Sequence, residues 1–154
     1  MRRYIPLAVL AAVTIVLAAV FGPGLYRGAL FRRDCHALLQ AAQEGRTADV
    51  LSGVIATQRQ RIARLVQEHV PADYYTRIHT LKLSSFERED SQTIWSLVIC
   101  RIEDGGVYQG KLRWIYQSGR WWWDVEQSYG AELTLSGEPA WQKFGTIIPL
   151  AEQL

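Results

Sequence analysis

Few residues of this chain have the type and spacing that catalysis requires. Asp73, Tyr75 and His79 lie close together in the sequence, and Tyr74 lies among them. If these side chains were buried together, a carboxylate and a phenol could transfer a proton to or from a bound molecule. The alternative is a helix-to-strand loop with ordinary polar residues. We therefore treat Asp73, His79 and Tyr75 as candidate catalytic residues that match no known motif, and we favour a protein that is not an enzyme.

The histidines do not indicate a metal site. His36, His69 and His79 stand apart in the sequence, and neither H-x-x-x-H nor C-x-x-C spacing occurs. Isolated histidines of this kind are typical of surface positions or of hydrogen-bonded positions in a core. We expect no bound metal and no cofactor.

Cys35 and Cys100 are the only two cysteines. Outside the cytoplasm, an even pair of cysteines indicates a disulfide. Closing a loop of about 65 residues would stabilise the fold by roughly 4 kcal/mol in the chain-entropy model. Each cysteine also fits an apolar face, where a reduced thiol packs as a small apolar side chain. A disulfide and two buried thiols are both compatible with the sequence.

The N-terminal segment indicates where the protein resides. Two arginines precede an apolar run from Tyr4 to Phe21, which is interrupted by a single threonine. As a helix this run would be about 27 Å long at ~1.5 Å per residue, close to the thickness of a bilayer core. A cleaved signal peptide using Ala18 or Ala19 is an alternative. A retained anchor fits the length best, so residues 4–21 are expected to contact the membrane.

Arginines flank the apolar run on both sides, so the numbers of positive charges before and after it are nearly equal. The positive-inside rule therefore does not by itself decide the orientation. A very short N-terminal tail usually stays inside, which predicts a single-pass protein with its C-terminal domain outside the cytoplasm. The net charge is +2, and the basic surplus lies next to the apolar run. The rest of the chain is mildly acidic and lacks the basic stripe that binds nucleic acid.

The remainder predicts helices followed by strands. Helical spacing of apolar residues begins near residue 29, and Gly45 and Pro71 are stop signals. Thr47 is expected to cap a second helix, and a capping box formed by Thr57 and Gln60 is expected to begin a third. Alternation of apolar and polar residues then predicts four strands, at 77–86, 93–103, 107–117 and 121–129. Hairpin turns are expected at 104–105 and 118–119.

The same alternation separates the three consecutive tryptophans, residues 121–123. Trp121 and Trp123 share a face that we expect to be core, and Trp122 lies on the opposite face. Strand 93–103 is apolar on both faces, so Trp95 and Trp122 would belong to an apolar patch on the outer face of the sheet. Either another subunit or a protein partner covers this patch, or the apolar tail, residues 131–154, packs back over it.

Three features resemble the NTF2-like (cystatin-like) superfamily of cone-shaped α+β domains: the stretch AAQEGRTADVLSGVIA, the paired strands around EDGG and the strand SGRWWWDV. The resemblance covers about residues 29–130. It implies helices on the concave face of a curved sheet, a pocket between them, and an outer face that often pairs subunits. Members include ketosteroid isomerases, dehydratases, polyketide cyclases and inert accessory domains, so this fold does not determine the function.

Together these observations predict an α+β protein with helices packed on a curved antiparallel sheet of about four strands. Residues 1–28 would be the membrane anchor, residues 29–130 an NTF2-like domain, and residues 131–154 a tail packed on that domain. The expected role is a non-catalytic assembly module that uses Trp122 and Trp95 to contact its own copy or a protein partner. The alternative is a small hydrophobic-ligand binder, or an isomerase- or dehydratase-like enzyme, that uses the pocket of the cone.

Overall fold

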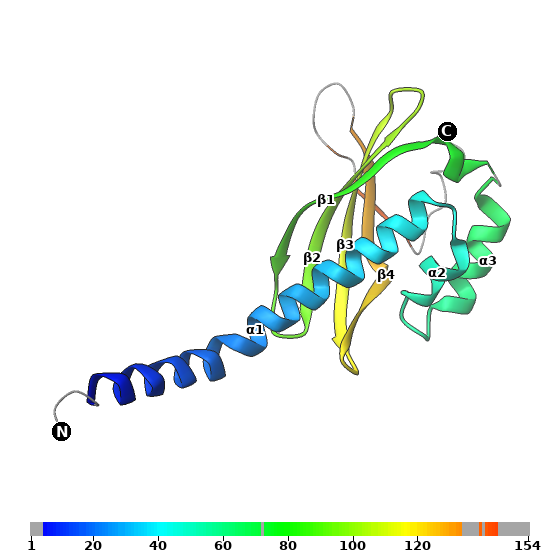
Figure 1. Ribbon diagram of the computed structural model, residues 1–154. Helices are drawn as coiled ribbons and strands as arrows, with labels where there is room; N and C mark the ends of the chain where they lie inside the picture. The colour runs from blue at the N-terminus through cyan, green and yellow to red at the C-terminus, as the bar shows by residue number, and fades with distance from the viewer. Residues whose placement is uncertain (1–4, 72, 134–138, 140, 145–154) are drawn as a thin grey trace.

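The computed structural model describes residues 5–71, 73–133, 139 and 141–144 (Figure 1), with side chains described from residue 11 onward. The described chain forms an α+β fold in which helices cover one face of a five-stranded antiparallel sheet. The predicted α+β class is therefore confirmed.

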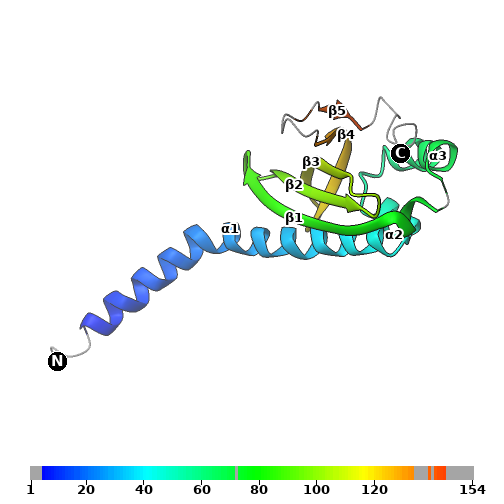
Figure 2. The same cartoon turned by 90° about the horizontal axis from the view of Figure 1, so that it is seen from above.

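The helix α1 (Ile5–Gln43) is continuous through the predicted anchor and the first predicted helix of the domain. Figure 2 shows that its N-terminal part projects away from the sheet, that it bends, and that its C-terminal part lies along the sheet. Pro23 lies within the helix, between two glycines, and a proline removes a backbone hydrogen bond and kinks a helix. The anchor and the domain thus share one bent helix.

The projecting part of α1 is apolar on all sides. Within the described residues, one stretch, Ala11–Gln43, is long and apolar enough to span a membrane, and little of its most apolar window is buried. The large apolar side chains that it leaves exposed are Val13, Ile15, Val16, Leu17, Val20, Phe21 and Leu25. The predicted membrane-spanning helix is supported by this length and composition.

Two short helices follow, α2 (Thr47–Ser52) and α3 (Arg59–His69). Gly45 has φ +70°, a left-handed conformation that suits a helix end, as predicted. The predicted caps are wrong, because the N-cap positions are Arg46 and Gln58 and neither makes a side-chain capping bond. The Gln58 side chain bonds to Asp124 of the sheet instead, so a tertiary contact replaces the local one.

The sheet follows the chain order β1-β2-β3-β4-β5, and every neighbouring pair is antiparallel. A short 3-10 helix, η1 (Tyr74–Arg77), leads into the first strand. All four predicted strands are present, and the tail adds a short fifth strand, so the expected number of about four is one too few. The strands are β1 (Ile78–Arg88), β2 (Thr93–Ile102), β3 (Val107–Gln117), β4 (Arg120–Glu132) and β5 (Gln142–Lys143).

The hairpin predictions differ in outcome. Ser118 and Gly119 both have positive φ, at 53° and 81°, as the predicted tight turn between β3 and β4 requires. Between β2 and β3 the connection is longer than the predicted two-residue turn, because residues 103–106 all lie outside the strands. Gly105 has φ +93° in that loop.

The described part of the tail packs at the β4 edge. Phe144 donates its backbone N–H to Ser128, and its ring meets Trp123 edge to face at 6.1 Å. The ring also packs against the buried core on the inner, helix-covered face. The described tail therefore contributes to the core side of the sheet rather than to the outer face. Residues 145–154 lie outside the described residues.

Candidate functional site: an apolar cavity beneath the helices

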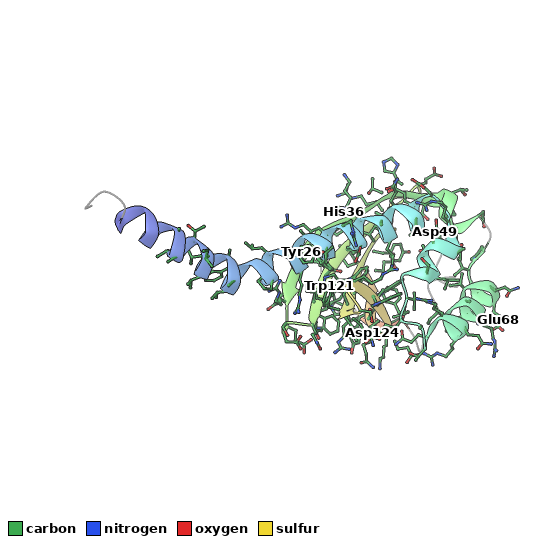
Figure 3. The ribbon with its side chains drawn as sticks, turned by 60° about the horizontal axis from the view of Figure 1, so that its bottom comes forward. Tyr26, His36, Asp49, Glu68, Trp121 and Asp124 are labelled. Carbon is green, nitrogen blue, oxygen red and sulfur yellow. The ribbon has the colours of Figure 1, made fainter. Side chains whose placement is uncertain are left out.

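The inner face of the sheet has a filled half and a hollow half. In the filled half, next to the bend in α1, Phe31 lies against three aromatic rings at centroid distances of 4.9–5.8 Å: Phe86, Trp114 and Trp121. Phe31 is fully buried, and Trp114 and Trp121 are 1% exposed. In Figure 3, Trp121 lies where β4 faces α1. Large rings leave no space between the helix and the sheet here.

The hollow half lies further along α1, where a cavity of about 300 Å³ separates the helices from the sheet. We call it the inner cavity. Its walls come from the end of α1, from α2, α3 and η1, and from β1 to β4. The lining consists mainly of aliphatic and aromatic side chains, including Leu38, Leu39, Ala42, Val50, Leu51, Val54, Ile62, Leu65, Val66, Leu81, Val98, Leu112, Trp123, Val125 and Phe144.

Small residues explain why side chains do not fill this half. Gly110 and Gly130 are opposite each other in the β3–β4 ladder, and both line the inner cavity. Ala42 of α1 and Ala131 of β4 are further small residues in the lining. A Cβ at Gly130 would approach the Phe144 ring to 2.8 Å, so this glycine also admits that ring. The Phe144 ring therefore covers these two glycines, where the sheet itself contributes no side chain, whereas the filled half of the sheet contributes tryptophan.

An irregularity in β4 shapes the floor of the hollow half. Lys111 pairs with Tyr129 and Arg113 with Asp124, so β4 inserts extra residues between two neighbouring pairs. The Ser128 hydroxyl stabilises this bulge by accepting hydrogen bonds from the Arg113 amide and the Trp123 indole, both at 2.9 Å. It also donates to the Asp124 carbonyl at 2.6 Å. Bulges of this kind bend a strand and redirect its side chains.

A polar cluster outside the inner cavity holds α3 in place. Asp124 is 4% exposed, and its carboxylate accepts a hydrogen bond from Gln58 at 2.8 Å and pairs with Arg113 at 2.7 Å. Gln58 also accepts a bond from the Glu126 amide, and Arg61 pairs with the Glu126 carboxylate at 2.9 Å. The N-terminal end of α3, which forms one wall of the cavity, is thus anchored to the β4 bulge.

Tyrosines form one end of the inner cavity, which we call the tyrosine rim: Tyr74, Tyr75 and Tyr108. The rings of Tyr74 and Tyr75 meet edge to face at 5.8 Å. Burial raises the pKa of Tyr74 to about 12, and the nearby Cys100 and Tyr108 add to this shift. Burial, followed by Glu132 and Asp104, also raises the pKa of Tyr108. Tyr74 and Tyr108 therefore remain neutral hydrogen-bonding groups at physiological pH.

Of the three candidate catalytic residues, the structure brings one to the inner cavity. Tyr75 lines it, whereas Asp73 and His79 are exposed and do not contribute to its walls. His79 lies at a register shift in β1, where the strand slips against β2 and the simple alternation used in the prediction fails. The predicted grouping of Asp73, His79 and Tyr75 in a pocket is therefore wrong.

The two cysteines are free thiols. Cys35 is fully buried in the filled half, and Cys100 is partly buried and lines the inner cavity. Burial raises the pKa of the Cys100 thiol to about 11, so it is protonated near neutral pH and is not an activated nucleophile. Each thiol packs as an apolar side chain, which is the second of the two alternatives drawn from the sequence.

Trp122 and Trp95 lie on the outer face, as the alternation predicts, and both are partly buried. The guanidinium groups of Arg59 and Arg120 lie over the Trp122 ring at 5.1 and 4.1 Å. The Trp95 ring stacks on Tyr129 at 6.3 Å, and its indole donates to Glu89 at 2.7 Å. Charged and aromatic neighbours within the chain therefore cover much of both tryptophans.

Among the described residues, no group of three or more histidine, cysteine, aspartate or glutamate side chains could hold a metal ion. Comparison of the chain with protein-family models, with curated proteins and with solved structures finds no match.

Proposed function

We propose that this chain is a membrane-anchored protein that binds a small apolar molecule in the inner cavity and performs no chemistry on it. The observation that carries the proposal is an apolar cavity of about 300 Å³, partly open to solvent, between the helices and the sheet of a small domain. Protein cores are normally close-packed, and an apolar cavity of about 150 Å³ is enough to bind benzene. The inner cavity is about twice that size.

The character of the lining supports binding rather than catalysis. Among the described residues, no aspartate, glutamate, lysine or arginine lines the inner cavity, and His69 at its edge is exposed. General acid–base catalysis requires a titratable group within hydrogen-bond reach of the reacting atom. Tyr74, Tyr108 and Cys100 carry raised pKa values, so they are poor bases near neutral pH.

We propose further that α1 anchors the domain in a membrane and that the domain is outside the cytoplasm. The exposed apolar side chains before Pro23 support the anchor. Helices over a curved sheet with a cavity between them also support an NTF2-like cone for residues 29–130. In this arrangement the apolar ligand would be held close to the bilayer, into which such molecules partition.

The test uses Cys100 as a reporter of the inner cavity. Full-length protein in phosphatidylcholine nanodiscs is treated with N-ethylmaleimide and increasing butylbenzene, and modification of the Cys100 peptide is followed by mass spectrometry. We expect saturable protection of Cys100, because a bound molecule would block the approach of the reagent to the thiol. Cys35 provides an internal control, since it is buried in the filled half.

A matched pair of variants separates the inner cavity from non-specific effects of butylbenzene on the bilayer. Ala42→Phe places a ring in the cavity, whereas Ala37→Phe places the same ring on the exposed side of α1. Saturable protection should be lost in the first variant and kept in the second. Equal protection in both variants, or none in the unmodified protein, would refute the proposal.

The assembly role predicted from the sequence remains a second proposal. It is favoured by the partly exposed apolar side chains of Trp95, Leu97, Ile99, Ile115 and Trp122 on the outer face. The cations over both tryptophans reduce the apolar surface available to a partner. The inner cavity therefore carries the stronger argument.

A further inference from the structure

The tyrosine rim determines which apolar molecules suit the inner cavity. Tyr74 and Tyr75 belong to η1, at the entry to β1, whereas Tyr108 lies near the start of β3. These segments converge at one end of the inner cavity, where all three tyrosines are lining residues. Three tyrosine side chains thus contribute to a lining whose other residues are largely aliphatic and aromatic.

These hydroxyls are available to a ligand. In the described part of the chain, no hydrogen bond joins the side chain of Tyr74, Tyr75 or Tyr108 to another residue. No side-chain nitrogen or oxygen that is fully buried there lacks a partner. The three hydroxyls are therefore open to the inner cavity or to solvent. A bound molecule with an oxygen atom at this end would give them a partner, and a pure hydrocarbon would not.

The charges around the tyrosine rim argue against a charged ligand. No charged side chain among the described residues lines the inner cavity, so a buried ion would have no partner and would pay a large desolvation penalty. Outside the rim, Arg77 is paired with Asp104 at 3.3 Å. Asp104 and Glu132 act on the Tyr108 hydroxyl with one sign and Arg77 acts on it with the other, so the rim has charges of both signs outside it and no single unpaired charge to attract an ion.

We infer that the ligand of the inner cavity is an uncharged, single-chain amphiphile, such as an alcohol or an ester, whose oxygen-bearing headgroup bonds to the tyrosine rim. Its hydrocarbon chain lies against Leu65, Val66 and Leu112. This inference rests on the proposed function and adds the chemical class of the ligand. The rim provides specificity at one end, and the apolar walls provide affinity.

The experiment compares four probes of similar size: 1-octanol, octanoate, octylammonium and butylbenzene. Binding to the full-length protein in phosphatidylcholine nanodiscs at pH 8 is measured by protection of Cys100, and the free aqueous concentration of each probe is determined separately. We expect 1-octanol to bind at least tenfold more tightly than either ion. This difference reflects the cost of burying an unpaired charge.

Tyrosine variants then test the headgroup contact. The double variant Tyr74→Phe/Tyr108→Phe removes two hydroxyls and keeps both rings. We expect the affinity for 1-octanol to fall about tenfold, since one hydrogen bond contributes ~0.5–1.5 kcal/mol. The affinity for butylbenzene should stay within about twofold. The control is Tyr129→Phe, because that ring stacks on Trp95 on the outer face and should affect neither probe.

The possible outcomes separate the two proposals. If octanoate or octylammonium bound as tightly as 1-octanol, the inference of an uncharged headgroup would be overturned. The same would follow if the double variant lost affinity for 1-octanol and for butylbenzene equally. If neither neutral probe protects Cys100 in the unmodified protein, the proposed function itself fails. If circular dichroism shows that the double variant is unfolded, the single variants Tyr74→Phe and Tyr108→Phe replace it, with a smaller expected loss of about threefold each.

Discussion

The two halves of the inner face share α1 and the strands of the sheet but differ in how completely side chains fill the space beside them. In the filled half, α1 contributes Phe31, and the sheet contributes Trp114 and Trp121. In the hollow half, α1 contributes Ala42, and the sheet contributes the facing pair Gly110 and Gly130. Both the side-chain volumes and the bulge in β4 therefore distinguish the filled half from the hollow half.

The filled half also fastens α1 to the sheet by hydrogen bonds. The Trp121 indole donates to the Arg27 carbonyl at 2.9 Å, and the Trp121 amide donates to the Asp34 carboxylate at 3.0 Å. Arg88 donates to the Gly24 carbonyl at 2.9 Å, and Arg27 donates to the Ser91 carbonyl at the same distance. The filled half thus joins the projecting part of α1 to the sheet.

The largest expected effect comes from emptying the filled half. Phe31→Ala should lower the free energy of unfolding by about 3–5 kcal/mol, because it removes a fully buried ring and leaves a cavity. Leu65→Ala, in the wall of the hollow half, should cost about 1 kcal/mol, because Leu65 is only partly buried beside an existing cavity. Chemical unfolding of the full-length protein, followed by circular dichroism, measures both. Equal losses would contradict the division into two halves.

The next effect concerns the polar cluster that anchors α3 over the hollow half. Asp124→Ala should lower the free energy of unfolding by about 2–3 kcal/mol. The substitution leaves the guanidinium of Arg113 without its buried partner and removes the hydrogen bond to Gln58. The control is Glu68→Gln on α3, whose exposed carboxylate points away from the domain in Figure 3 and should change stability by less than about 0.5 kcal/mol. The same unfolding measurement applies. If Asp124→Ala lowered stability as little as Glu68→Gln does, the polar cluster would not be what holds α3 in place.

Filling the hollow half should stabilise the protein and weaken binding. Ala42→Leu places a larger apolar side chain in the inner cavity and should raise the free energy of unfolding by about 1 kcal/mol. The affinity for butylbenzene should fall at least tenfold. Ala37→Leu, on the exposed side of α1, should change neither quantity appreciably. If Ala42→Leu destabilised the fold, the surrounding wall would be close-packed rather than hollow.

Alkaline pH should weaken the hollow half through Cys100 and Tyr74. Burial raises the folded-state pKa of Cys100 from 9.0 to about 11 and that of Tyr74 from 10.0 to about 12. Below pH 9 both groups are neutral in the folded and unfolded states, so their contribution to the free energy of unfolding is fully present. Above pH 9 the unfolded state releases protons first, and stability falls as the pH rises through the folded-state values.

The pH effect can be assigned by substitution. We expect Cys100 to account for about 1 kcal/mol of the stability lost between pH 8.5 and pH 10.5, a reduced value because the thiol is only partly buried. Unfolding of the unmodified protein and of Cys100→Ala at the two pH values measures this contribution. A steeper pH dependence in the variant than in the unmodified protein would reverse the assigned sign.

The smallest expected effect concerns the outer face. Trp122→Ser removes the ring between Arg59 and Arg120 and should cost about 1 kcal/mol or less, since exposed cation–π contacts contribute ~0.5–1 kcal/mol each. Ligand affinity should not change, because Trp122 does not line the inner cavity. Sedimentation analysis of the same variant tests the assembly hypothesis, which predicts weaker self-association. Unchanged self-association would remove that role from Trp122.

Several elements of the fold were predictable because they depend on local backbone geometry. Period-two alternation located the four long strands, with errors of only a few residues at their ends, and it separated Trp122 from Trp121 and Trp123. The apolar length of the N-terminal segment indicated a membrane helix. The helix caps at Thr47 and Thr57 were not predictable in this way, because residues distant in sequence determine where the Gln58 side chain bonds.

The candidate site was only partly visible in the sequence. Tyr75 was selected and lines the inner cavity, but Asp73 and His79 were selected with it and are exposed. Tyr108, which also lines the inner cavity, and Asp124, which pairs with Arg113 beside it, were not selected from the sequence. The glycines at positions 110 and 130 were the available signal, since glycine inside a strand pattern often marks a bulge or a close approach.

By itself the sequence determined the secondary structure, the order of the elements and the apolar N-terminal helix, because each depends on patterns repeated within a short stretch of chain. Only the tertiary structure decided that one half of the inner face is solid and the other hollow. That difference depends on the sum of side-chain volumes arriving from α1, α3 and the strands, and on the bulge that displaces β4. Residues that are distant in sequence contribute to that sum, so no local pattern contains it.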